Sequence, residues 1–286
     1  MSDTEDETSE SLPAPAVSVS CAAQRGGVSF PTTRIVPDEQ AVAFTYNGST
    51  HAVMMATPAD LEDFSIGFAL TEGLIEDRSE IEDLEIMPTP LGIEARVWLK
   101  GDRAEAYAKR RRSMAGPTGC GLCGIESLEA AMRPLPRVTA EAKVSPQAII
   151  AAMASLDPAQ TLNSVTHAVH GAGFWTEREG LVALREDVGR HNALDKLVGA
   201  LVRDGRTAAD GMILMTSRVS IELIQKAARI NAPVLVAVSA PTAAAIKLAD
   251  EAGMTLVAVA RRQDFEVFTH PERLNETSRQ VASHVA

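Results

Sequence analysis

The sequence predicts an α/β protein in which a larger C-terminal domain, built on a parallel sheet, follows a smaller α+β domain. Three apolar runs carry this prediction: 211–216 (GMILMT), 234–239 (VLVAVS) and 255–261 (TLVAVAR). Each run is continuous rather than alternating, and helical patterns separate them, as is typical of parallel strands buried on both faces. Two more strands are expected at 167–170 and 181–186, so the second half of the chain should form one sheet covered by helices.

Composition divides the chain into four segments. In order, they are a disordered acidic tail (1–26), a small α+β domain (27–110), a loop and helix with two cysteines (111–138), and the α/β domain (139–278). The tail is expected to be disordered because it is rich in Ser, Thr, Glu and Pro, and because its first 24 residues include no Lys or Arg.

The small domain should contain a hairpin, a helix and a further strand. Asn47-Gly48 separates two apolar segments and favours a two-residue hairpin turn. Thr57 is the expected N-cap of the next helix and Pro58 its first residue, because hydroxyl caps and a proline at the first position are typical of helix starts. The stretch 93–101 (IEARVWLKG) alternates apolar and polar residues and predicts a strand.

Four helices are expected in the α/β domain. One begins at Pro146 with Ser145 as its N-cap. The other three accompany the strands and are expected within 191–203 (HNALDKLVGALVR), 219–230 (VSIELIQKAARI) and 241–252 (PTAAAIKLADEA).

Polar side chains follow the ends of the expected strands. They are Asp187, Arg190 and His191 after the strand at 181–186, Ser217 and Arg218 after 211–216, Ser239 and Thr242 at the end of 234–239, and Arg261 and Arg262 at the end of 255–261. Ligands of open parallel sheets bind outside the carboxyl ends of the strands, where helix N-termini present free amides. The pattern therefore favours a binding site for a phosphorylated ligand. Taken singly, each hydroxyl could instead cap a helix, and each arginine could be a solvent-exposed side chain at the end of a strand.

Cys120 and Cys123 form a CxxC motif in a glycine-rich segment that starts at Lys109 and is predicted to be a loop. The motif serves zinc, redox and persulfide chemistry alike. Zinc is disfavoured because Cys21, the third cysteine, lies in the tail and no His-x-Glu precedes the pair; no metal is expected. The basic run at 109–112 (KRRR) favours a thiolate over a thiol, and a thiolate on a flexible arm suits the transfer of sulfur.

Composition also limits the compartment and the partners. The 286-residue chain has a formal net charge of -11, which disfavours a general nucleic-acid surface. No apolar run approaches the length that crosses a bilayer, and the acidic N-terminus does not have the pattern of a secretory signal. With an odd number of cysteines, a disulfide framework is not expected, so we place the protein in the reducing cytoplasm.

The chain resembles the formate dehydrogenase accessory sulfurtransferase family (FdhD/NarQ type). The matching stretches are TPADLEDFSIGFALTEGLI (57–75), TGCGLCGIESLE (118–129), EDVGRHNALDKLVGAL (186–201), TSRVSIELIQKAA (216–228), APVLVAVSAPTAAAIKLADEAGMTLVAVAR (232–261) and FTHPERL (268–274). These stretches occur in the same order as in the family, and together they are specific for it. One position departs: the family often has glycine before the arginine that matches Arg218, whereas this chain has Ser217.

The resemblance implies a sulfurtransferase. Such proteins take persulfide sulfur from a cysteine desulfurase and pass it to the molybdenum bis(guanine dinucleotide) cofactor, before the cofactor enters formate dehydrogenase. The family's persulfide-carrying cysteine matches Cys120, with Cys123 as helper or relay. Its cofactor-binding segment matches Val259, Ala260, Arg261, Arg262, Gln263 and Asp264. The resemblance further implies a homodimer and a larger domain with the cytidine deaminase fold but without its zinc ligands.

Two readings compete with the sulfur relay. One is a chaperone that binds the molybdenum cofactor without transferring sulfur, and the other is a zinc-dependent deaminase. For the relay, the arginines should contact pyrophosphates while Ser217, Ser239 and Thr242 donate hydrogen bonds. Asp187 or Asp195 could read the guanine, because a carboxylate accepts from the N1–H and amino groups of that base.

Overall fold

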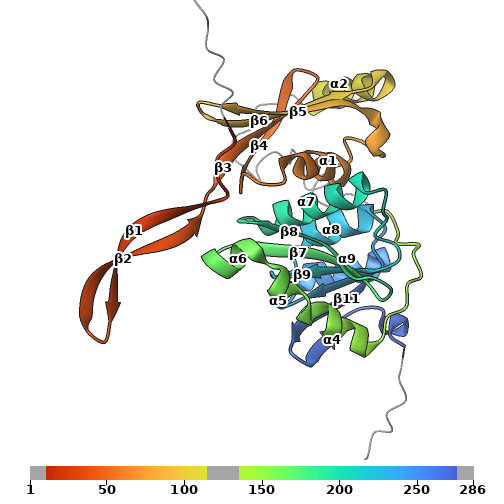
Figure 1. Cartoon of the computed structure of the whole chain (residues 1–286). Helices are drawn as coiled ribbons and strands as arrows, with labels where there is room; N and C mark the ends of the chain where they lie inside the picture. Colours follow the sequence, from red (N-terminus) through yellow and green to blue (C-terminus); the bar gives the residue numbers. More distant parts are fainter. Residues whose placement is uncertain (1–10, 115–134, 276–286) are drawn as a thin grey trace, which may run out of the picture.

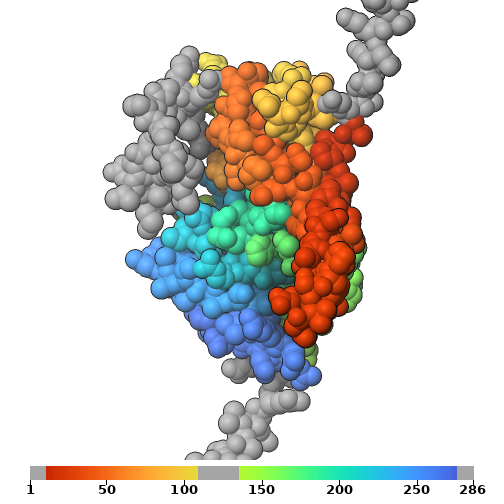
Figure 2. Space-filling view, turned by 90° about the vertical axis from the view of Figure 1, so that its left-hand side faces the viewer, coloured from red at the N-terminus to blue at the C-terminus, as the bar shows by residue number. Residues whose placement is uncertain are grey.

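The computed structural model describes residues 11–114 and 135–275, with the backbone alone for 109–114. Two domains are stacked (Figure 1): a four-stranded sheet with helix α1 lies above a larger layered domain that holds a six-stranded sheet. Figure 2 shows the same stack from the side, with the small domain in orange and yellow above the green and blue of the larger one. Within the described part of the chain, no helix is both long enough and apolar enough to cross a membrane.

The larger domain is organised around the six-stranded sheet. Its strands are β7 (His170–Thr176), β8 (Gly180–Asp187), β9 (Met212–Met215), β10 (Val234–Ala237), β11 (Thr255–Arg261) and β12 (Asp264–Val267), in the spatial order β12-β11-β10-β9-β7-β8. Strands β9, β10 and β11 are parallel, as the continuous apolar runs predict. Strand β7 is antiparallel to both β9 and β8, so β8 runs in the direction of the parallel set. The carboxyl ends of β8, β9, β10 and β11 therefore lie along one edge of the sheet.

Helices cover both faces of this sheet. One core is formed by the sheet with α7 (Arg190–Arg203), α8 (Ile221–Arg229) and α9 (Ala243–Ala252). A second core lies on the opposite face, where α4 (Pro146–Ala154) packs beside the short helices α5 (Leu156–Ala159) and α6 (Thr161–Thr166). The predicted start of α4 is confirmed, because the Ser145 hydroxyl accepts the backbone N–H of Ala148 at 3.1 Å and Pro146 is the first helical residue.

The small domain packs one face of its sheet on α1. The strands are β3 (Gln40–Tyr46), β4 (Ser49–Ala56), β5 (Ile81–Thr89) and β6 (Gly92–Leu99), in the order β4-β3-β6-β5; helix α1 spans Leu61–Thr71, α2 spans Gly101–Met114, and a 3-10 turn spans Arg78–Glu80. The Asn47-Gly48 turn is confirmed, and both residues have the positive φ that a two-residue hairpin turn of this kind requires. Strand β6 alternates buried and half-buried residues as predicted.

Two glycines let the domains approach each other at the crossing of α1 and α7. A Cβ on Gly67 would lie 1.7 Å from the carbonyl oxygen of Asp195, and a Cβ on Gly199 would lie 1.8 Å from that of Asp63. No side chain fits at either distance, so the two helix backbones are in direct contact. This contact fixes the small domain on the helix that begins at the end of β8.

The predicted tail is only partly correct. Residues 1–10 lie outside the described chain, but β1 (Ala16–Arg25) and β2 (Val28–Pro37) pair in one continuous antiparallel register. The hairpin projects from the body of the molecule, and α6 lies beside β2 (Figure 1). Gly26 and Gly27 both have positive φ and form its two-residue turn. This Gly-Gly pair is a hairpin signal, but the prediction of a disordered tail was based on the acidic composition of the preceding residues.

Three other boundaries differ from the prediction. Helix α1 begins at Leu61 rather than Pro58, because the backbone and hydroxyl of Thr57 are bonded to the other domain. Strand β7 begins at His170, which is where the predicted strand 167–170 ends, and His167 instead terminates α6 in the left-handed conformation. Residues 109–114 continue α2, because their Lys and Arg residues are good helix formers. The helix that the sequence predicts after the CxxC motif lies outside the described residues.

Candidate functional site

The edge of the large sheet where β8, β9, β10 and β11 end is the candidate site, here called the rim. The segments that leave β9 and β10 run side by side, because Val219 and Pro241 form a parallel bridge and the N–H of Thr242 donates to the carbonyl of Val219 at 3.0 Å. The rim therefore brings together residues from four strand ends and three helix starts, as the sequence predicts. Its members are Arg190, His191, Ser217, Arg218, Ser220, Glu222, Ser239, Thr242, Arg261 and Arg262.

Three guanidinium groups are exposed on the rim. Arg218 follows β9, while Arg261 and Arg262 lie where β11 turns into β12. The Nε of Arg261 donates to the carbonyl of Val238 at the end of β10, a contact of 3.3 Å that holds its side chain along the edge. Guanidinium groups bind phosphate oxygens bidentately, so this part of the rim is suited to an anionic, phosphate-bearing ligand.

The segment Val259–Asp264 changes direction at the rim through a bulge. The register of β11 against β12 shifts between Ala258 and Arg261, and Val259 and Arg262 both have positive φ, at 54° and 56°. A left-handed β-branched residue is uncommon and costs on the order of 1–3 kcal/mol. Ala260 is buried behind the bulge, and the next four residues, Arg261, Arg262, Gln263 and Asp264, are exposed.

Two of the predicted hydroxyl donors have structural partners instead. Ser217 is buried, with 3% exposure, and its hydroxyl donates to the carbonyl of Arg218 at 3.0 Å. The Thr242 hydroxyl oxygen accepts the N–H of Ala245 at 3.2 Å and caps α9, so the simpler interpretation holds for this residue. Ser239 is half-buried at the end of β10 and remains a candidate contact.

Asp187 is not on the surface of the rim, which corrects its prediction as a ligand contact. Its carboxylate is 0% exposed and lies 2.6 Å from Nζ of Lys196, which is also 0% exposed. It accepts the backbone N–H groups of Thr57 and Gly189 and the side-chain amide of Asn192 at 2.7–3.0 Å. Burial lowers the pKa of Lys196, against the opposing attraction of Asp187. These contacts tie the end of β8 to the small domain.

Asp195 is also committed to the domain interface. It is buried, accepts a 2.6 Å hydrogen bond from the hydroxyl of Thr71 in α1, and lies 3.0 Å from Nζ of Lys226 in α8. Burial raises the pKa of Asp195 to about 6, although Lys226 acts in the opposite direction. Asp187 and Asp195 are the two carboxylates predicted to contact the guanine, and neither is therefore available to a ligand.

Three rim residues that follow β8 and β9 form a polar cluster. His191 Nε2 lies 3.3 Å from the hydroxyl oxygen of Ser220 and 3.8 Å from a carboxylate oxygen of Glu222. Ser220 occupies the N-cap position of α8 but makes no side-chain cap bond. Burial, helped by the charge of Arg190, lowers the pKa of His191 to about 4, so its imidazole is neutral at physiological pH. Sequence analysis did not predict Glu222 as a site residue, because an acidic residue in the first turn of a helix is common and needs no functional explanation.

Cys120 and Cys123 lie outside the described residues. The candidate site is therefore the part of the molecule predicted to bind a ligand, and the cysteines predicted to carry sulfur are not part of it.

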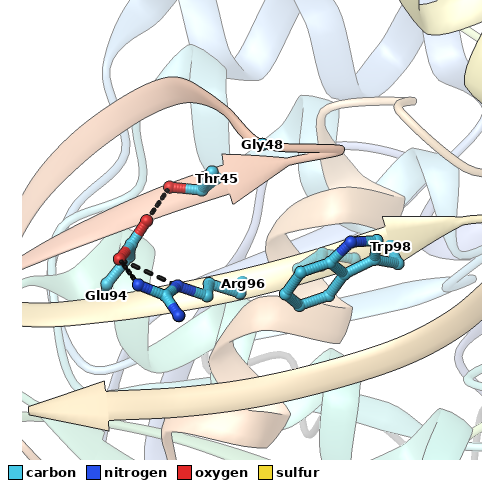
Figure 3. A pocket seen from close by; sticks show the side chains of 6 residues that line it. Thr45, Gly48, Glu94, Arg96 and Trp98 are labelled. Atoms are coloured by element: carbon cyan, nitrogen blue, oxygen red, sulfur yellow. Dashed lines mark hydrogen bonds and ion pairs between the residues drawn. The ribbon is translucent and has the colours of Figure 1, made fainter.

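A shallow pocket of about 310 Å³ lies elsewhere, on the outer face of the small sheet. Glu94 is its carboxylate, but Figure 3 shows that group already bonded to Arg96 at 2.7 and 2.9 Å and to the hydroxyl of Thr45 at 2.9 Å. Trp98 lies farther along the same strand. With its carboxylate paired, this pocket is a weaker candidate than the rim.

Comparison with known proteins gives consistent relatives. The family model described as the FdhD/NarQ family matches residues 37–275. The chain is 55% identical over 253 residues to the sulfur carrier protein FdhD of Agrobacterium fabrum, covering 88% of this chain and 93% of that one. It is 52% identical over 247 residues to the protein of the same name from Brucella abortus, covering 86% and 92%. A crystal structure from Desulfotalea psychrophila, provisionally described as a formate dehydrogenase accessory protein, is similar with a TM-score of 0.70 at 26% identity, over 91% of this chain and 99% of that one.

Proposed function

Because this chain belongs to the FdhD/NarQ family, we propose that it accepts sulfur as a persulfide on Cys120 and passes it to the molybdenum bis(guanine dinucleotide) cofactor that formate dehydrogenase uses. The relatives are named sulfur carrier proteins, and the family is associated with the maturation of formate dehydrogenase. The observation that carries the cofactor half of the proposal is the rim, where Arg218 lies exposed at the end of β9, and Arg261 and Arg262 lie exposed at the end of β11, with β10 between the two strands.

The sulfur half of the proposal is thiol chemistry of the CxxC pair. The Cys120 thiolate attacks the outer sulfur of the persulfide on a cysteine desulfurase; that S–S bond breaks, the desulfurase cysteine leaves as a thiolate, and Cys120 carries the sulfur. Cys123 then attacks the inner sulfur, so the terminal sulfur leaves as HS⁻ for the molybdenum while the two cysteines close a disulfide. A cellular thiol reductant reopens the disulfide. The basic run at 109–112 favours the attacking thiolate.

The cofactor is the substrate here, and its pyrophosphates carry the charge that the rim can bind. Arginine at the ends of β9 and β11 would hold these groups, and Ser239 at the end of β10 lies between them. The larger domain, with its parallel strands and helices on both faces, is proposed to be of the cytidine deaminase type. The cytoplasm is the proposed compartment.

Mass spectrometry tests the proposal. Protein incubated with a desulfurase and cysteine should gain the mass of one sulfur atom on Cys120, and Cys120→Ala should gain none. Cys21→Ala is the matched control, because Cys21 is exposed on β1 and is not part of the motif. Labelling that is unchanged in Cys120→Ala would remove the relay.

The runner-up function is a chaperone that binds the cofactor without transferring sulfur. Under that reading, Cys120→Ala would still support maturation of formate dehydrogenase, whereas the relay requires that activity be lost. The deaminase reading requires a stoichiometric zinc ion, which metal analysis of the purified protein would detect.

A homodimer is also proposed, and the β1–β2 hairpin supports it. An isolated two-stranded hairpin is marginally stable in water. The register places Val17, Val19 and Val28 on the same face of this one, and they are 42%, 38% and 65% exposed. A second copy would cover this apolar face. Light scattering should show a dimer that Val17→Glu and Val19→Glu weaken; a monomer in the unmutated protein would contradict the proposal.

A further inference from the structure

One edge of the small sheet lacks the features that keep a strand from pairing with another chain. In this sheet β4 and β5 are the two edge strands. Charged residues and proline protect β5, which carries Glu82, Asp83, Glu85 and Pro88. Strand β4 (STHAVMMA) has no Asp, Glu, Lys, Arg or Pro, and its Val53 and Met55 side chains are 59% and 50% exposed. We call the segment Val53–Met55 the open edge.

The backbone of β4 directs alternate residues away from β3. In an antiparallel pair, one residue points its N–H and C=O to the same side, and successive residues alternate. The carbonyl of Met55 accepts the side-chain amide of Asn192 in α7 at 2.9 Å, and the N–H of Thr57 donates to Asp187 at 3.0 Å. Both residues therefore face away from β3, and Val53 has the same parity. Outside the β3–β4 ladder, Val53 makes no backbone–backbone hydrogen bond within 11–114 and 135–275.

The open edge specifies an extended chain as its partner. Backbone donors and acceptors that recur every second residue are matched by another strand, whereas a helix has no free backbone groups along its length. Ala52 and Met54 pack on the α1 side of the sheet, so Val53 and Met55 lie on the outer face. A strand added here would be stabilised by apolar side chains at alternate positions, opposite these two residues.

Position and size indicate a transient partner that uses the rim. Asn192 and Asp187, which bond the last part of β4, belong to the start of α7 and the end of β8, so the open edge leads directly to the rim. Two half-exposed side chains and a few backbone groups are far less than the roughly 800 Å² per partner of a stable interface. The open edge therefore suits a partner that binds and leaves, whereas the β1–β2 hairpin offers a second copy a larger apolar face.

We infer that the open edge of β4 binds an extended segment of the catalytic subunit of formate dehydrogenase, which adds a fifth strand to the small sheet. This inference rests on the proposed function, because that function makes this enzyme the receiver of the cofactor. A segment bound at Val53 and Met55 holds the enzyme beside the rim while the cofactor is handed over, and its small contact lets the enzyme leave afterwards.

Hydrogen exchange of the full chain tests the inference, with and without the cofactor-free catalytic subunit of formate dehydrogenase. Mass spectrometry with electron-transfer fragmentation follows single backbone amides. The N–H groups of Val53 and Met55 should exchange about tenfold more slowly, or slower still, in the complex, because they gain hydrogen-bond partners. The N–H groups of Ala52 and Met54 point toward β3 and should change little.

A variant with a charge on the open edge tests the same contact by affinity. Val53→Lys uses the means by which natural edge strands avoid pairing, and the side chain is exposed, so the fold should persist. It should weaken binding of the catalytic subunit about tenfold or more in a calorimetric titration. Met87→Lys is the matched control, because Met87 is 39% exposed on β5 at the other edge of the same sheet, and it should leave the affinity unchanged. A thermal melt of each variant confirms that it is folded.

The outcomes separate the inference from the proposed function. The inference is wrong if the catalytic subunit does not bind, if it binds without slowing exchange at Val53, or if it binds Val53→Lys as tightly as the unmutated protein. Slow exchange at Val53 that appears without the subunit and grows with protein concentration would show a second copy on the open edge, and would overturn the inference as well. Persulfide loading of Cys120 tests the proposed function independently, and Val53→Lys should leave it unchanged.

Discussion

Replacing Asp187 by Asn should destabilise the protein severely, because it removes one charge of a buried pair. Asp187 and Lys196 are both fully buried, and their charged atoms are 2.6 Å apart. The N–H groups of Thr57 and Gly189 donate to different oxygens of the carboxylate, and Asn has only one acceptor oxygen, so the variant loses one of these hydrogen bonds together with the charge. Breaking a buried ion pair by removing one partner costs about 3–5 kcal/mol. That is a large fraction of the roughly 5–15 kcal/mol by which a typical domain is stable.

Urea denaturation followed by circular dichroism measures this change as a difference in the free energy of unfolding. Lys196→Met should cost a similar amount, because it leaves the Asp187 charge buried. The double variant Asp187→Asn/Lys196→Met should be more stable than either single variant, since no uncompensated charge remains. Asp210→Asn, an exposed acid at the opposite end of the sheet, is the control and should change little. A loss below about 1 kcal/mol in Asp187→Asn, or additive losses in the double variant, would refute a structural ion pair at this position.

Four further variants test other contacts, and the free energy of unfolding is measured for each. Gly199→Ala should destabilise by several kcal/mol, because a Cβ at 1.8 Å from a backbone oxygen forces the helices apart, and a change within 0.5 kcal/mol would contradict that crossing. Thr242→Ala should cost about 1 kcal/mol, whereas Ser220→Ala at the equivalent position of α8 should cost less than half of that, because only Thr242 makes a cap bond; equal losses would show that the two positions are alike. His191→Gln should reduce the acid sensitivity of the fold. The unfolded chain binds a proton on His191 near pH 6.5 and the folded chain only near pH 4, so stability is lost as pH falls through that range, by about 1–2 kcal/mol between pH 7 and 5. Between pH 7 and 5 the free energy of unfolding of His191→Gln should fall by about 1–2 kcal/mol less than that of the unmutated protein. Parallel pH profiles of the two proteins would exclude a buried neutral histidine.

Much of the candidate site could be predicted because it follows from local pattern. Continuous apolar runs separated by helical patterns indicate buried parallel strands, and the carboxyl ends of parallel strands share one edge of the sheet. The sequence therefore predicts Arg218 and Arg261 at this edge. The glycine turn at Asn47-Gly48 and the Ser145 cap are equally local, since each depends on bonds within a few residues.

What the sequence could not decide is which polar residues of the rim face outward. Asp187 and Glu222 both follow strand ends and both are acidic, yet one is fully buried against a lysine and the other is exposed. The difference arises from the small domain, whose Thr57 closes over the end of β8 and whose backbone meets α7 at Gly67. Contacts between residues more than a hundred positions apart leave no local periodicity in a sequence. Sequence pattern therefore determined the strands, the edge and its positive charge, and the packing of one domain on the other decided which carboxylate is left to meet a ligand.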